Sequence, residues 1–252
     1  MSQKLSSVLS PSFKALRQQL GLKEPDRRPM VDSCRADDSD FCLEAVAKGF
    51  LTRQQMLHAA ECYRLGKSRS GKCIFWLIDA KGHCLEGHIG NGWVSEMLKH
   101  RYPDLAQYVR TRHCLFGLHL LSANCQQSSV NYQLTIAIVD SEPSAVILSE
   151  LYPQMLWMAH ASFMMLDLLE PLRGHKVTFF PRTDATMENY LDYCELADQA
   201  RRTYQIDATV SNILEDHASP EQKFHKIDLV DFLFPTTDFT DYPRECKYLC
   251  HL

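Results

Sequence analysis

The chain has 252 residues, of which 45% are hydrophobic, a formal net charge of −4 and ten scattered cysteines. It is long enough to bury a full core and form one large domain, or a small and a large one. No apolar run approaches the ~20 residues of a membrane span, and residues 1–20 lack the apolar stretch of a signal peptide, so we expect a cytoplasmic protein without a membrane partner. No Cys-x-x-Cys pair occurs, which favours reduced thiols over disulfides.

Charge is distributed unevenly along the chain. Residues 1–132 carry 18 Lys and Arg against 12 Asp and Glu, whereas residues 133–252 carry 9 against 19. The basic half is where a polyanion is expected to bind, although solvated cations on ordinary surfaces remain the alternative. Phe75 and Trp76, next to Lys72, are candidates for stacking on bases, although alternate residues of their strand face the core and one of the two is expected to do so. The candidate nucleic-acid contacts are Lys67, Arg69, Lys72, Arg110 and Arg112, within clusters that also include Arg64, Lys99, Arg101 and His113.

The N-terminal half is predicted to contain a linker followed by a small α+β module. In residues 1–45 we expect a short helix at 12–20, then a charged, proline-bearing segment that is a linker or disordered. In residues 46–130 a helix capped by Thr52 runs to about Arg64, with Leu57 on its buried face. Residues 72–79 and 82–89 indicate a β-hairpin, residues 93–102 a short helix, and residues 114–121 a strand.

Residues 131–252 show strands that end in acidic turns and lead into helices. A strand is expected at 134–139, a turn holding Asp140 and Glu142, and a helix at about 143–151. A second such unit has a strand at 176–180, a turn holding Asp184 and a helix beginning near Ala185, whose Tyr190, Cys194 and Ala197 can face the sheet. The tail is expected to be helical in two pieces. This order predicts an α/β fold with a parallel sheet flanked by helices, and two acidic turns that can share a divalent cation.

Between about Phe50 and Phe234 the chain resembles the Toprim-like proteins of bacterial conjugative and other mobile elements. The resemblance rests on five blocks in the same order: ECYRLGKSRSGKCIFWLID, RHCLFGLHLL, VDSEPSAVILSELYP, PLRGHKVTFFPRTDA and SPEQKFHKIDLVDFLFP. It implies the Toprim fold of primases and topoisomerases, in which a glutamate after the first strand and a later Asp-x-Asp pair hold magnesium. It also implies catalytic roles for Asp140, Glu142 and Asp184, with Asp140 and Asp184 as metal ligands.

The chain departs from this family pattern at the acidic positions themselves. Asp140 stands in place of the first glutamate, and Arg182 replaces the first aspartate of the pair. A guanidinium cannot bind magnesium, and it offers a permanent counter-ion to Asp140 and Asp184. His160 and Ala161 replace the flexible glycines that usually follow the second strand. We therefore expect a Toprim-like fold with a degenerate site, in which Mg²⁺ binding is weak or absent.

Three functions follow from these observations. The first is a nucleic-acid-binding accessory protein of a mobile element, with DNA as a likelier partner than RNA on the sequence alone. The second is a Mg²⁺-dependent primase-type nucleotidyl transferase or nuclease that uses Asp140, Glu142 and Asp184. The third is a protein-interaction module that contacts a replication or host protein through the acidic half.

Several other residues have both a functional and a structural interpretation. Two groups of residues have the chemistry of a zinc site but lack the paired knuckles, which favours buried thiols and surface histidines. They are Cys73, His83, Cys84 and His88, and Cys246, Cys250 and His251. His160 and His175, near strand ends, are candidates for general acids or bases, but neither has a partner by spacing, which favours satisfied or solvated histidines. Asp228 and Asp231 resemble the acidic close of primase Toprim regions, and equally a helix cap and a solvated residue.

Overall fold

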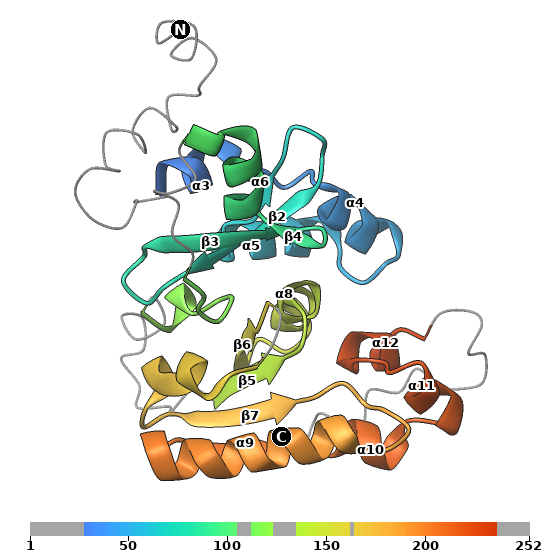
Figure 1. Cartoon of the computed structure of the whole chain (residues 1–252). Coiled ribbons are helices and arrows are strands. Elements are labelled where there is room, and N and C mark those ends of the chain that lie inside the picture. The colour runs from blue at the N-terminus through green and yellow to red at the C-terminus, as the bar shows by residue number, and fades with distance from the viewer. Residues whose placement is uncertain (1–27, 105–111, 123–134, 162–163, 236–252) are drawn as a thin grey trace, which may run out of the picture. The chain divides into compact units, whose positions relative to one another are not determined.

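The computed structural model describes residues 28–104, 112–122, 135–161 and 164–235. The chain divides into unit 1, Met1–Ser129, and unit 2, Val130–Leu252. Each unit contains a four-stranded sheet of its own (Figure 1). The expected helix at 12–20, Leu134, Arg110 and the C-terminal cysteines lie outside the described residues. None of the helices in the described ranges is long and apolar enough to cross a membrane.

The sheet of unit 1 is antiparallel and contains the predicted hairpin. Its strands follow the order β1 (Gly66–Lys67), β2 (Cys73–Ile78), β3 (Cys84–Ile89) and β4 (Gly92–Trp93). All six residues of β2 are buried, so both faces of this strand are covered. Phe75 is 8% exposed and Trp76 is fully buried. The prediction that these two aromatic rings stack on bases is therefore wrong, because hydrophobic packing occupies both.

The helices of unit 1 correct the predicted linker. They are α3 (Arg28–Cys34), α4 (Asp40–Ala47), α5 (Arg53–Cys62) and α6 (Val94–Arg101). Val31 is 2% exposed and belongs to a core cluster with Trp76 and Ile78, against which Met30 and Cys34 pack. The apolar positions 30, 31 and 34 have helical spacing, and the surrounding charges and prolines concealed it. Residues 28–47 are therefore largely helical and belong to the packed unit.

Two further predictions in unit 1 had mixed outcomes. Thr52 is the N-cap of α5, where its side chain accepts from Gln55 N and the Gln55 side chain accepts from Thr52 N. Leu57 is 40% exposed, while the smaller Ala59 faces the core. The predicted strand at 114–121 is wrong: Gly117 has a φ of +84° and begins a turn, and residues 119–122 are helical. A left-handed glycine ends an extended segment readily because it has no Cβ.

A buried carboxylate positions the start of α6. The N-cap residue Trp93 provides no side-chain cap. Instead, Glu86 Oε1 in β3 accepts hydrogen bonds from Gly87 N at 2.9 Å and from Ser95 N at 3.1 Å. Glu86 is fully buried. A carboxyl oxygen that accepts hydrogen bonds at the N-terminus of α6 is favourable because the first amides of a helix lack backbone partners.

Unit 2 has the predicted α/β architecture, with a sheet of four parallel strands in the order β6-β5-β7-β8. The strands are β5 (Thr135–Val139), β6 (Met155–Ala159), β7 (Lys176–Phe180) and β8 (Asp207–Val210). The helices are α8 (Glu142–Leu151), the 3-10 helix η2 (Leu166–Leu172), α9 (Glu188–Tyr204), α10 (Ile213–His217), α11 (Pro220–Phe224) and α12 (Leu229–Leu233).

The helices after β7 differ from their predicted bounds. α9 begins at Glu188 instead of Ala185, and it buries Tyr193 and Ala197, while Tyr190 and Cys194 are half-buried. The tail forms three helices because Ser219 and Asp228 each cap a new one with a capping box. Asp228 is therefore a helix cap, which was one of the two interpretations of this residue.

We predict that Gly87→Ala destabilises unit 1. A Cβ at Gly87 would lie 2.7 Å from Trp76 Cε3 and 2.9 Å from Val94 Cγ2, and both of these side chains are buried. We expect the free energy of unfolding in urea to fall by about 1–3 kcal/mol, as for overpacked cores. Gly92→Ala is the matched control, since its nearest neighbour would be Glu96 Oε2 at 3.9 Å. Equal stability of the two variants would contradict this packing.

Candidate functional site

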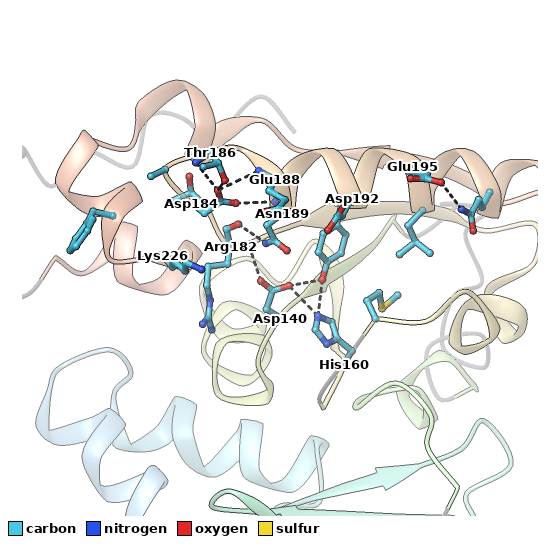
Figure 2. Close-up of a pocket in the computed structure, with 17 residues that line it drawn as sticks. Asp140, His160, Arg182, Asp184, Thr186, Glu188, Asn189, Asp192, Glu195 and Lys226 are labelled. Carbon is cyan, nitrogen blue, oxygen red and sulfur yellow. Dashed lines mark hydrogen bonds and ion pairs between the residues drawn. The ribbon is translucent and has the colours of Figure 1, made fainter.

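A pocket of about 1060 Å³ lies in unit 2 at the C-terminal ends of the parallel strands (Figure 2). Asp140 follows β5 and Asp184 follows β7, and these two strands are hydrogen-bonded neighbours. Because parallel strands present their carboxyl ends at one edge, both residues reach the same pocket. Arg182, His160 and residues of α9 also line it. Of the four residues that the sequence placed around the acidic turns, the structure thus brings together Asp140, Arg182 and Asp184.

Glu142 is the exception. It is the first residue of α8, is 4% exposed, and lies outside the pocket lining. In the same first turn of α8, Ser144 Oγ instead donates at 2.5 Å to Oδ2 of Asp228, the N-cap residue of α12. His175 precedes β7 and so lies at the opposite end of that strand from Asp184. The three carboxylates of the predicted catalytic set do not line one pocket.

Asp140 is held by three hydrogen-bond donors from three different segments. Its Oδ1 accepts from Tyr193 OH at 2.5 Å and from His160 Nε2 at 3.1 Å. Its Oδ2 accepts from the backbone N–H of Arg182 at 2.8 Å. Burial by itself raises the pKa of Asp140, but the bonds from His160, Tyr193 and Arg182 outweigh burial and lower that pKa. Asp140 is therefore a fully bonded carboxylate in its charged form.

Tyr193 and His160 are functional-site neighbours that sequence reasoning did not connect. His160 Nε2 lies 2.7 Å from Tyr193 OH, and both residues are buried. Burial and the adjacent negative charge of Asp140 raise the pKa of Tyr193, so its hydroxyl remains a donor. The spacing of residues 140, 160 and 193 carries no signal of this cluster. The sequence indicates only that Tyr193 is buried, because its helical spacing places it on the same face of α9 as Ala197 and Ala200.

Asp184 organises the start of α9. Its Oδ1 accepts from Thr186 N at 2.7 Å, Thr186 Oγ1 at 2.6 Å and Glu188 N at 3.3 Å, and its Oδ2 accepts from Asn189 N at 2.8 Å. The N-cap residue Met187 is left-handed, with a φ of 60°, and has no side-chain cap. Burial raises the pKa of Asp184, but the Thr186, Asn189 and Glu188 donors lower it to about 2. Asp184 thus performs the capping that Met187 cannot.

Arg182 contributes to the cluster through its backbone. Besides its N–H bond to Asp140, its carbonyl accepts from Asn189 Nδ2 at 2.6 Å. Its side chain is exposed and points away from Asp184 (Figure 2). Within the described ranges, no carboxylate oxygen forms an ion pair with its guanidinium. The expected counter-ion therefore forms no direct ion pair with Asp140 or Asp184, whose oxygens accept from backbone amides and from the side chains of His160, Tyr193 and Thr186.

The hydrogen bonds at this edge limit metal binding. Both oxygens of Asp140 and both of Asp184 already accept hydrogen bonds. In the part of the chain that the structure describes, no group of three or more His, Cys, Asp or Glu side chains is arranged to hold a metal ion. Cys73 and Cys84 are buried free thiols, and His83 bonds to Asp79. These carboxylates are arranged as acceptors of protein donors.

The basic residues of unit 1 are partly neutralised by acidic neighbours. Lys67 Nζ lies 2.5 Å from Asp38 Oδ2, and Lys72 Nζ lies 2.9 Å from Asp40 Oδ2. Arg69 and Arg112 are exposed. Over residues 28–104 and 112–122 there are 12 Lys and Arg against 10 Asp and Glu. Most of the basic excess predicted for this half therefore comes from residues outside the described ranges.

The chain matches a family model described as Domain of unknown function (DUF6371) over residues 43–183. This match covers more than half of the chain. The chain belongs to this family. In this chain the matched segment contains Asp140, His160 and Arg182, whereas Asp184 and Tyr193 follow it. No curated protein and no solved structure matches the chain.

We predict that Asp184→Asn lowers stability in a pH-dependent manner. A carboxyl whose pKa is lowered in the folded state stabilises it fully above the unfolded pKa of ~3.9, and this contribution is lost as pH falls toward about 2. At pH 7 we expect Asp184→Asn to lower the free energy of unfolding by about 2 kcal/mol. The difference from the unaltered chain should shrink between pH ~4 and ~2.

Urea unfolding followed by circular dichroism at several pH values measures this difference. Asp192→Asn is the matched control, since Asp192 is an exposed residue of the same helix and no hydrogen bond to its carboxylate is found among the described residues. We expect the control to change stability by less than about 0.5 kcal/mol. A difference between Asp184→Asn and the unaltered chain that is constant with pH would contradict the ionised cap.

Proposed function

We propose that this protein is a non-catalytic accessory protein with a Toprim-like domain, whose acidic motif residues stabilise the fold instead of holding magnesium. The observation that carries this proposal is the hydrogen bonding of Asp140 and Asp184, in which each carboxylate oxygen accepts from a protein donor. The Toprim relationship itself rests on the sequence resemblance. A parallel sheet with acidic turns after adjacent strands is compatible with it.

A catalytic role requires rearrangements that the pocket opposes. Mg²⁺ demands near-octahedral oxygen ligands at about 2.0–2.1 Å. A cation on Asp140 would have to displace the hydroxyl of Tyr193 or the imidazole of His160, and leaving a buried donor unpaired costs about 1–3 kcal/mol. A cation on Asp184 would compete with the amides that begin α9. The third carboxylate of an enzymatic site, Glu142, lies outside the pocket.

The partner that we propose is nucleic acid, with DNA ahead of RNA. This rests on the resemblance to mobile-element proteins and on the basic half of the chain. Within the described ranges, Arg69, Lys99 and Arg101 have no carboxylate partner, in contrast to Lys67 and Lys72. Binding through such residues is electrostatic and independent of sequence, because phosphate contacts fix position without reading bases.

Calorimetric titration with Mg²⁺ and Mn²⁺ tests the non-catalytic proposal. We predict no saturable binding to the unaltered chain at ~1 mM cation. Even the weak Ca²⁺ sites of extracellular modules, with dissociation constants up to ~1 mM, are half-occupied at this concentration. Arg182→Asp combined with Asp140→Glu should introduce measurable affinity, because it restores the two carboxylates that the resemblance predicts. Tight Mg²⁺ binding to the unaltered chain, abolished by Asp184→Asn, would support the nucleotidyl transferase or nuclease instead.

Electrophoretic shifts on single-stranded and duplex DNA and RNA test the nucleic-acid proposal. We predict that replacing Arg69, Lys99 and Arg101 together by Gln weakens binding to all sequences alike. The slope of log affinity against log salt on duplex DNA should decrease by about 2–3, as expected when three phosphate contacts are lost. Lys67→Gln with Lys72→Gln should have a smaller effect, since both lysines are already paired.

A control variant separates these contacts from a general loss of charge. Gln at Arg173, Lys176 and Arg202 removes the same three charges from exposed positions of unit 2. We expect this control to retain the salt slope of the unaltered chain. Absence of any shift at ~50 mM salt, where contacts with several phosphates bind strongly, would eliminate the nucleic-acid proposal.

A further inference from the structure

The pocket of unit 2 extends along an exposed acidic face of α9. Glu188, Asp192 and Glu195 are exposed, line the pocket, and follow one another at helical spacings of four and three residues. Like charges at these spacings repel and destabilise a helix. Across the described ranges, no Lys, Arg or His forms an ion pair with any of the three. The folded unit therefore maintains a row of uncompensated carboxylates beside a cavity.

The pocket as a whole is negative. Its lining includes five acidic residues, two of them Asp140 and Asp184, against Arg182 and Lys226. Asp140 and Asp184 remain ionised at neutral pH because their pKa values are lowered. Figure 2 shows Arg182 and Lys226 toward one end and Glu195 toward the other, so the negative charge is concentrated along α9. This field repels a nucleic-acid backbone and attracts cationic groups.

Apolar side chains accompany the acidic row. Phe224, at the end of α11, lines the pocket and is 73% exposed. Met164 and Leu196 line it as half-buried residues. An exposed aromatic ring can contact a guanidinium or ammonium group, and apolar surface can cover the methylene stems of Arg and Lys. A bare metal ion or a polyamine would use the carboxylates and leave much of this apolar surface uncovered.

The dimensions suit a peptide segment. From Glu188 to Gln199, the pocket-lining positions of α9 span eleven residue steps, or about 16 Å at 1.5 Å per residue. An extended chain advances about 3.3 Å per residue, so about five residues would lie along this distance. Alternate residues of an extended peptide face the same side, so two or three side chains could point toward the acidic row.

We propose that this pocket binds an extended basic segment of a partner protein, with Arg or Lys side chains toward Asp192 and Glu195 and apolar side chains toward Phe224. This inference goes beyond the nucleic-acid role of unit 1 and does not depend on it. It requires only the charge, exposure and length of the pocket in unit 2. Affinity is expected to depend on salt, because the contacting carboxylates are exposed.

Fluorescence anisotropy with the full chain and two labelled hexapeptides tests the proposal. The probes are a blocked peptide of alternating Arg and Leu and a second of alternating Glu and Leu. We expect saturable binding of the Arg peptide alone at ~50 mM salt. Asp192→Asn with Glu195→Gln should weaken that binding about fivefold or more, as expected for the loss of two charge contacts. Phe224→Ser should weaken it as well, without changing the charge.

A matched control removes two charges from the same unit outside the pocket. Glu170→Gln with Asp207→Asn changes exposed residues that do not line it, and should leave the affinity for the Arg peptide unchanged. The proposal is overturned if this control weakens binding as much as the pocket variant, if the Glu peptide binds equally, or if no saturable binding occurs. None of these outcomes bears on the magnesium or DNA experiments.

Discussion

The bonding of Asp140 is the interaction on which the functional edge of unit 2 depends. Through one carboxylate the end of β5 is connected to the residue after β6, to the turn after β7 and to the middle of α9. These segments are far apart in sequence, and this carboxylate bonds to all of them at once. Because the group is largely buried, its charge is stable only while all three donors remain in place. The positions of Arg182 and His160 thus follow from the same requirement.

Asp184 illustrates how one residue type can serve either catalysis or folding. A carboxylate at the end of a parallel strand, just before a helix, faces unpaired amide groups. If it accepts from those amides, as Asp184 does, it becomes a cap with a depressed pKa. If ligands from neighbouring turns draw it outward, it can hold a cation. This chain departs from the Toprim-like pattern at Arg182 and Asp140, and its acidic residues have the capping arrangement. They remain in the pocket, but their oxygens accept hydrogen bonds from the protein.

The sequence predicted the elements whose signals are local. β7 has its predicted bounds, the hairpin of unit 1 is present, and the parallel sheet follows from the repeated strand, turn and helix order. The errors arose where tertiary packing decided the outcome. α3 was hidden because only three apolar residues mark its buried face, and the apolar run at 114–121 was ambiguous between strand and helix. The partners of His160 and Asp140 could not be inferred, because contacts between residues 20 to 53 positions apart leave no spacing pattern.

The order of the elements around Asp140 also decides which fragments of this protein can be studied alone. The family match ends at residue 183, before α9 and β8, whereas the hydroxyl of Tyr193 and the helix that Asp184 caps lie after it. A fragment cut at that boundary would leave Asp140 without one of its donors. It would also turn β7, still paired with β5, into an open edge strand on the side that β8 covers, which favours aggregation. The family match therefore ends inside unit 2, before the residues that complete its sheet and the bonds of Asp140. Sequence relatives of this family should be compared over the region that continues through α12.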